Sequence, residues 1–270
     1  ERDNVDVLCL QEVKGMAAGH AALLQRGWVI HEHGNVAILI SVHTAQNITS
    51  PTQVWRGTMG ADDIDAMSIT LDTPDGPLAI VNAYLPSGVD DMPHRVVEDD
   101  GSAPGAQSHE RSVPPHKTTG RRRKEWDRDK VEEMHGVIFS HIIDFKMAVL
   151  CMDANETTCR TGRRMIKTLE QGRTEFSYSG TKKKATTMDV YHKTMIDAHE
   201  NKHPHLYNGS VLHEDAYTHE SVVTGELNPS HSRIDYTLVT PSLTARMTKC
   251  EVSSSSRHYG IGTSASFHKL

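Results

Sequence analysis

Short apolar runs separated by polar turns fill the first third of the chain. Val5–Leu10 is mostly apolar and branched, which predicts a strand, and Ala17–Gln25 predicts a helix that ends before Gly27. Further strands are expected at Trp28–His31, Asn35–Val42, Asp65–Leu71 and Pro77–Tyr84. Thr73-Pro74-Asp75-Gly76 is a strong turn signal between the last two strands, so an antiparallel meander is expected.

The segment from Pro86 to about Gly120 has no hydrophobic period. It collects Pro, Gly, Ser, Asp and His, a composition that predicts a long mobile insertion at about 86–120 rather than packed structure. Strands are expected on both sides of this insertion, so residues 1–270 are interpreted as a single domain.

The second half of the chain begins with a helical stripe. Val131, Met134, Ile138, Ile142 and Phe145 recur at steps of three and four, as on one buried helix face. Met147–Cys151 is then a buried strand, and Arg163–Gln171 and Thr187–His199 are interpreted as further helices, with late strands at Asp215–His219, Ile234–Val239 and Met247–Ser253. The alternation of helices and strands predicts an α/β layered sandwich.

Composition excludes several classes of protein. The 29 Lys and Arg against 35 Asp and Glu give a net charge of −6. A protein that coats nucleic acid through a generally basic surface is therefore excluded, and any phosphate contact must come from a local cluster of basic residues. No apolar run approaches the roughly 18 residues that cross a bilayer. No secretory leader precedes the first strand, and the 4 cysteines form no paired spacing, which favours an intracellular, reducing compartment.

The 18 histidines do not predict a zinc site. His203-Pro204-His205 and His31-Glu32-His33 are close pairs, but a zinc site needs three or four converging ligands and neither pair has a third partner at a clear spacing.

Three carboxylates stand at or near strand ends. Glu12 follows Val5–Leu10, Asp153 follows the strand ending at Cys151, and Asp235 lies in the strand-like run that ends at Val239. A carboxylate at a strand end can be held over a cleft, and Mg²⁺ takes oxygen ligands, commonly one or two carboxylates completed by phosphate and water. Any one of these acids alone is more often a turn or surface residue.

Five short motifs occur in a fixed order along the chain. They are Leu10-Gln11-Glu12, Asn82-Ala83-Tyr84-Leu85-Pro86, Met152-Asp153-Ala154-Asn155, Ser232-Arg233-Ile234-Asp235-Tyr236 and Ser266-Phe267-His268. In this order they resemble the endonuclease/exonuclease/phosphatase superfamily, which has the deoxyribonuclease-I-like fold, and are closest in pattern to the endonuclease domains of LINE-type retrotransposons. The resemblance implies a four-layer α/β/β/α sandwich that lacks its first strand.

The resemblance also implies a role for each motif residue. Glu12 resembles the ligand of a catalytic Mg²⁺, for which Mn²⁺ is an alternative, and Asp153 resembles the residue that orients or deprotonates the attacking water. Its companion Asn155 and the tyrosine Tyr84 resemble phosphate-contacting residues. His268 resembles the histidine that contacts a phosphate oxygen, and Asp235 the acid that supports its charge. Together these roles imply hydrolysis of DNA phosphodiesters by a monomeric enzyme.

Three departures from the family pattern predict weak or absent activity. Only eleven residues precede Glu12, so the family's opening strand, with its Asn or Asp near the metal, is expected to be missing. Phe267 replaces an acidic residue beside His268 and cannot ligate a cation. Met152 replaces a glycine, which is expected to add volume where the substrate backbone approaches.

Local basic clusters could supply phosphate contacts despite the net negative charge. Arg160, Arg163 and Arg164 follow the Asp153 motif directly and are the best candidates, although charge runs beside polar segments are commonly solvated loops.

Two alternatives to a DNA endonuclease remain. The first is a phosphatase of the same superfamily, although its phosphoinositide branch typically carries Trp-Cys-Asp-Arg where this chain has Ser232-Arg233-Ile234-Asp235. The second is a non-catalytic retroelement remnant, which Phe267 favours.

Overall fold

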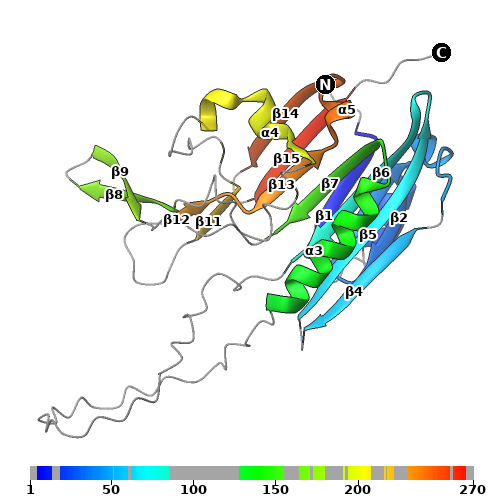
Figure 1. Ribbon diagram of the computed structural model, residues 1–270, viewed down its shortest axis with the longest axis horizontal. Helices are drawn as coiled ribbons and strands as arrows, with labels where there is room; N and C mark the ends of the chain where they lie inside the picture. The colour runs from blue at the N-terminus through cyan, green and yellow to red at the C-terminus, as the bar shows by residue number, and fades with distance from the viewer. Residues whose placement is uncertain are drawn as a thin grey trace, which may run out of the picture.

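The computed structural model is an α/β structure whose strands form several sheets (Figure 1). It describes residues 5–13, 19–50, 52–59, 62–85, 128–154, 164–170, 173–179, 191, 194–207, 216, 218–221, 230–255 and 258–265. The predicted insertion at about 86–120 lies outside these residues, so the interpretation as a single domain with an insertion stays a prediction.

Two sheets form the body that carries the predicted motifs. The three-stranded sheet has the spatial order β1 (Val7–Gln11), β3 (Val36–Ser41) and β2 (Trp28–His33). The six-stranded sheet has the order β10 (Ile196–Asp197), β13 (Asp235–Val239), β7 (Met147–Asp153), β6 (Gly76–Tyr84), β5 (Asp62–Thr73) and β4 (Gln53–Met59).

Smaller elements complete the described structure. A four-stranded sheet consists of β11 (His219–Ser221), β12 (Ser230–Ser232), β8 (Arg164–Glu170) and β9 (Arg173–Ser179). A separate hairpin is formed by β14 (Met247–Ser255) and β15 (His258–Ala265). The helices are α1 (His20–Gln25), α2 (Val42–Ala45), α3 (Arg128–Ile143), α4 (Ala198–Lys202) and α5 (Pro241–Thr244), with a 3₁₀ turn, η3 (Pro204–Tyr207).

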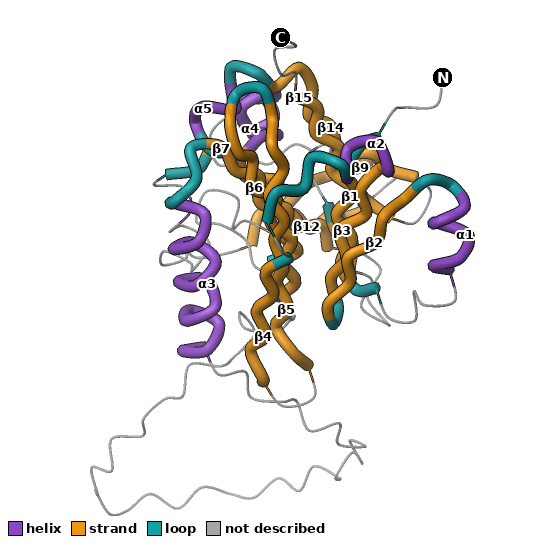
Figure 2. The backbone as a smooth tube through the Cα atoms, turned by 90° about the vertical axis from the view of Figure 1, so that its right-hand side faces the viewer, coloured by secondary structure: helices purple, strands orange, loops and turns teal. Residues whose placement is uncertain are grey.

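The elements stack in four layers, which Figure 2 shows from the side. Helix α3 covers one face of the six-stranded sheet, where Met134, Ile138 and Ile142 pack against Val81 and Leu150. The other face packs on the three-stranded sheet through an apolar interface. That interface includes Val36, Ile38, Ile40, Met67, Ile69, Ile80 and Met147. Leu23 of α1 packs on the outer face of the three-stranded sheet, so the predicted multilayer α/β architecture is confirmed.

One parallel pair in the six-stranded sheet aligns two of the predicted motifs. The described pairs are antiparallel except β6 with β7, which run parallel from Leu78 beside Met147 to Tyr84 beside Asp153. A parallel pair needs a crossover connection, and α3 lies in that connection. The carboxyl ends of β6 and β7 therefore lie at the same edge of the sheet.

Most expected elements in the first half agree with the structure. The strands and the turn before Gly76 are found, but the expected meander is divided between two sheets. Of the expected helical stripe, Met134, Ile138 and Ile142 are buried on α3, whereas Phe145 lies beyond the end of the helix and the side chain of Val131 is outside the description. The helix expected at Arg163–Gln171 is wrong, because Arg164–Glu170 is strand β8, paired on both sides. The apolar positions of that segment fit both a helical period and the period of two of a strand. Pairing with β9 and β12 selects the extended conformation.

Two further expectations are wrong in part. The helix expected at Thr187–His199 is wrong at Ile196–Asp197, which form strand β10, and α4 begins at Ala198; residues 187–190, 192 and 193 lie outside the description. The strand expected at Asp215–His219 overlaps strand β11 at His219, and residues 215 and 217 lie outside the description. Strands β4, β9, β12 and β15 were not predicted, because their polar residues give no clear alternation of apolar and polar positions. No helix in the described part of the chain is long and apolar enough to cross a membrane.

Helix α3 places a histidine in the core. His135 is 2% exposed, and its Nδ1 lies 2.9 Å from the hydroxyl of Tyr191, whose ring packs edge-on against it. Burial lowers the pKa of His135 from 6.5 to about 4, because the charged imidazolium loses its hydration. His135 is therefore neutral in the folded chain at neutral pH.

Acidification is expected to destabilise the fold through His135. In the unfolded chain the histidine binds a proton below about pH 6.5, whereas in the folded chain it resists protonation down to about pH 4. The contribution of His135 to the free energy of unfolding should therefore fall by about 3 kcal/mol between these two pH values, whereas Asp235, whose pKa is raised to about 6, changes the stability in the opposite direction. Urea unfolding of the parent chain and of His135 variants at a series of pH values measures the His135 contribution as the difference between them. His135→Gln should remove most of it, whereas His43→Gln, at an exposed position, should retain it.

Candidate active site

Three of the predicted site residues form a row across neighbouring strands. Tyr84 at the end of β6 is in register with Asp153 at the end of β7, and Asp153 is in register with Asp235 at the start of β13. Residues directly opposite each other on neighbouring strands point to the same face of a sheet. The three side chains therefore share one face at one edge of the six-stranded sheet.

Glu12 joins this row from the other sheet. It follows directly after β1, and its carboxylate oxygen Oε1 accepts a 3.0 Å hydrogen bond from the hydroxyl of Tyr84. Its negative charge also raises the pKa of Asp235. The structure thus brings Glu12, Tyr84, Asp153 and Asp235 together, although they come from four separate parts of the sequence.

The backbone at Glu12 is strained. Its φ of 56° lies in the left-handed region, and it is the one non-glycine residue with positive φ in the described part of the chain. The neighbours hold it there, because Gln11 pairs with Val36 and the amide of Val13 donates to the carbonyl of Asn35 at 3.2 Å. Such a conformation costs of order 1 kcal/mol and is concentrated at functional sites.

A buried asparagine fixes the position of β1 over β6. Asn82 is fully buried, and its Nδ2 donates to the carbonyl oxygens of Leu10 and Ala37, each at 2.9 Å. Its Oδ1 accepts a 2.5 Å hydrogen bond from Nε2 of Gln11. These bonds join the two sheets two residues before Tyr84 and immediately before Glu12. The motifs that contain Asn82 and Gln11 did not by themselves predict this positioning role, because it depends on the packing of one sheet on the other.

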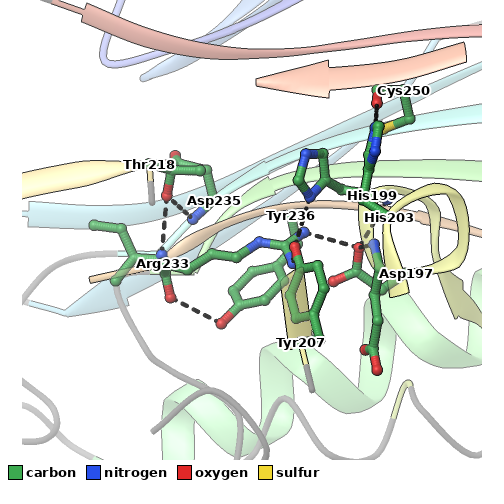
Figure 3. Close-up of polar contacts among 11 residues, drawn as sticks. Asp197, His199, His203, Tyr207, Thr218, Arg233, Asp235, Tyr236 and Cys250 are labelled. Carbon is green, nitrogen blue, oxygen red and sulfur yellow. Dashed lines mark hydrogen bonds and ion pairs between the residues drawn. The ribbon is translucent and has the colours of Figure 1, made fainter. Parts of the chain in front are cut away.

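The environment of Asp235 opposes its ionisation in part. Burial raises the pKa of Asp235 to about 6, and the negative charge of Glu12 acts in the same direction. A hydrogen bond from Thr218 and the positive charge of Arg233 lower it. The Thr218 hydroxyl oxygen also accepts from the amides of Ile234 and Asp235, each at 3.1 Å (Figure 3). Asp235 is therefore mostly ionised at neutral pH, and a nearby cation would relieve its repulsion from Glu12.

Arg233 is a buried cation two residues before Asp235. It is fully buried, its guanidinium carbon lies 5.1 Å from the ring centres of both Tyr207 and Tyr236, and one guanidinium nitrogen donates to the Tyr207 hydroxyl. Another nitrogen lies 2.8 Å from Oδ1 of Asp197 (Figure 3). Asp197 Oδ1 also caps α4, so this ion pair links the start of β13 to that helix.

The histidines beside Arg233 extend this polar network. His199 Nδ1 lies 2.7 Å from the Tyr207 hydroxyl, and His203 Nε2 lies 2.7 Å from the carbonyl oxygen of Cys250 (Figure 3). His203 is therefore engaged with the β14 backbone. Within the described residues, no three or more His, Cys, Asp or Glu side chains are grouped so as to hold a metal ion.

Several predicted positions fall outside the description. Asn155, Arg160, Arg163, Phe267 and His268 are among them, and for Arg164 only the backbone, as the first residue of β8, is described.

The expectation for Met152 is corrected by the structure. Met152 is 1% exposed and packs with Met134 and Ile138 beneath α3, on the opposite face of the sheet from Asp153. Successive side chains of a strand alternate between faces, so the side chain of Met152 does not enter the site.

The oxygen donors at this edge fit a hard divalent cation. Glu12 is hydrogen-bonded to Tyr84, which lies in one row with Asp153 and Asp235, and Mg²⁺ requires only one or two protein carboxylates when substrate phosphate and water complete its coordination. Glu12 would hold the ion.

Comparison with known proteins identifies the fold. No family model and no curated protein match the sequence. The solved structure of the Neisseria 3′ phosphatase NExo, bound to a product DNA hairpin, matches with a TM-score of 0.56 at 14% identity over 98% of this chain and 91% of that chain. D. rerio TDP2, complexed with a single-strand DNA product, matches with a TM-score of 0.54 at 10% identity over 95% and 84%. An AP endonuclease from Archaeoglobus fulgidus matches with a TM-score of 0.50 at 14% identity over 97% and 89%. The chain therefore has the fold of the endonuclease/exonuclease/phosphatase superfamily, as its ordered motifs predict.

Proposed function

We propose that this protein is a Mg²⁺-dependent hydrolase of DNA phosphodiester bonds. The observation that carries the proposal is the convergence of Glu12, Tyr84, Asp153 and Asp235 at one sheet edge, with Glu12 contributed by the other sheet. Two structures with the same fold, NExo and TDP2, contain DNA products. Mn²⁺ is an alternative ion, and a DNA substrate implies an intracellular site of action in the nucleus or cytoplasm.

Each residue has a distinct role in the proposed reaction. Glu12 would hold the cation, which when bound would offset negative charge on the phosphate. Asp153 orients the attacking water and accepts its proton, with Asn155 positioning the phosphate. The Tyr84 hydroxyl, which donates to Glu12 in the structure, is assigned the contact with a phosphate oxygen. Asp235 is ionised at neutral pH and favours the charged form of His268 on another phosphate oxygen.

DNA contacts beyond the scissile phosphate are proposed for Arg160, Arg163 and Arg164. The net charge of −6 provides no general attraction to DNA, so binding would depend on such a local cluster and weaken steeply with salt.

A specific residue favours a second candidate, a non-catalytic retroelement remnant. Phe267, beside His268, offers no oxygen to a cation. Slow hydrolysis is therefore expected even if the site is competent, and measurements must separate metal binding from turnover.

Nicking of supercoiled plasmid tests the proposal. The full chain is expected to nick slowly with Mg²⁺ and not with a chelator, and Asp153→Asn should reduce the rate by at least about 100-fold, because it removes the base while preserving shape. Asp144→Asn, at an exposed position after α3, is the matched control and should nick as the parent does. Equal rates for Asp153→Asn and the parent would contradict the assignment. Mg²⁺ binding without nicking would favour the remnant.

A further inference from the structure

Two cysteines from different sheets meet beneath the candidate active site. Cys9 lies in β1 and Cys151 in β7, and their thiols are joined by a hydrogen bond. Both are free thiols, and both are enclosed between the two sheets. Cα atoms of β1 and β7 come within 8 Å of each other. A disulfide spans Cα atoms about 4.4–6.8 Å apart, so its formation would hold β1 and β7 at this separation at the two cysteines.

The hydrogen bonds around Asn82 explain why these cysteines face each other. Asn82 is beside Cys151 in the register of β6 and β7, and it also holds the carbonyl of Leu10, the residue after Cys9. Cys151 is also next to Thr237 of β13 in the sheet register. The two thiols are thus fixed by the same contacts that position β1 over the six-stranded sheet.

The two thiols are chemically unequal. The hydrogen bond from Cys9, together with one from Thr237, lowers the pKa of Cys151 although burial opposes this. The same hydrogen bond with Cys151, with burial, raises the pKa of Cys9. Cys151 is therefore the thiol that ionises and reacts first, and Cys9 is the neighbour that can resolve the product.

We propose that Cys9 and Cys151 form a reversible disulfide when the protein meets a peroxide. The Cys151 thiolate attacks one peroxide oxygen, the O–O bond breaks, and hydroxide leaves and takes up a proton, giving a sulfenic acid and water. Cys9 then attacks this sulfur, the S–O bond breaks and a second water leaves. Two thiols and hydrogen peroxide thus yield one disulfide and two waters.

This bond would link the strands that carry two site carboxylates. Cys9 is three residues before Glu12, and Cys151 is two residues before Asp153. Oxidation would fix the two sheets to each other at this edge. The disulfide can form whether or not the chain hydrolyses DNA, so its test uses no activity measurement.

Peptide mapping tests the proposal. The reduced full-length chain is treated with hydrogen peroxide, blocked with an alkylating reagent, digested and analysed by mass spectrometry with and without dithiothreitol. A joint peptide containing Cys9 and Cys151 is expected to disappear on reduction. Titratable thiols in denatured protein should fall from 4 to two, since one pair is consumed.

Matched variants decide the outcome. Cys9→Ser and Cys151→Ser should each abolish the joint peptide, whereas Cys250→Ser, at the buried cysteine of β14, should retain it. Thr237→Val should slow its formation several-fold, and Thr70→Val, at another buried threonine, should not. Crosslinks of Cys9 or Cys151 to Cys159 or Cys250, overoxidation of Cys151 without a crosslink, or no reaction would each overturn the proposal.

Discussion

The Glu12→Gln variant is expected to bind Mg²⁺ about 100-fold more weakly than the parent chain while keeping its fold. Glutamine has the same shape and retains a carbonyl oxygen for the hydrogen bond from Tyr84, but it carries no charge. Loss of that charge removes about 3 kcal/mol of attraction for the cation, at 1.4 kcal/mol per tenfold in affinity. Isothermal titration calorimetry measures the binding constant, and plasmid nicking should fall in parallel.

A control and a second variant separate charge from backbone strain at this position. Glu133→Gln, on the exposed face of α3, should bind Mg²⁺ as the parent does. Glu12→Gly should lose the ion as Glu12→Gln does. Its free energy of unfolding should exceed that of Glu12→Ala by about 1 kcal/mol, as measured by urea unfolding, because only glycine adopts a φ of 56° without strain. Unchanged Mg²⁺ affinity in Glu12→Gln would contradict the metal site, and equal stability of Glu12→Gly and Glu12→Ala would contradict the backbone geometry.

Arg233→Met is expected to lower the free energy of unfolding by about 3 to 5 kcal/mol. Removal of a buried cation leaves Asp197 as an uncompensated buried charge, and the rings of Tyr207 and Tyr236 lose the guanidinium between them. Asp197→Asn in the same chain should recover part of the loss, because the amide oxygen can still cap α4. Urea unfolding of the two single variants and the double variant measures the coupling energy.

A second ion pair provides the comparison for Arg233. Arg246 and Asp75 form a pair whose side chains are 25% and 19% exposed. Water solvates each partner in part, so Arg246→Met should cost about 1 kcal/mol or less. If Arg233→Met costs no more than Arg246→Met, the buried pair does not stabilise the fold as inferred.

The local hydrophobic pattern predicted a helix or strand correctly where the packing of the segment agreed with the period of its apolar residues. The stripe of Met134, Ile138 and Ile142 lies buried on α3 as expected, since one apolar helix face needs only one partner surface. Arg164–Glu170 shows the opposite case. Met165 and Leu169 fit a helical stripe, but strands on both sides supply backbone partners, and these hydrogen bonds decide the conformation.

The sequence by itself determined the order of the motifs, the superfamily resemblance and the strand ends at which Tyr84 and Asp153 stand. Only the tertiary structure decided that Glu12 reaches Tyr84 from another sheet, that Asn82 joins those sheets, and that Cys9 meets Cys151. A strand's sequence encodes which side chains share a face, because that depends on a period of two. It does not encode which strand pairs beside it or which sheet packs above it, because register and stacking arise from contacts between segments distant in the chain.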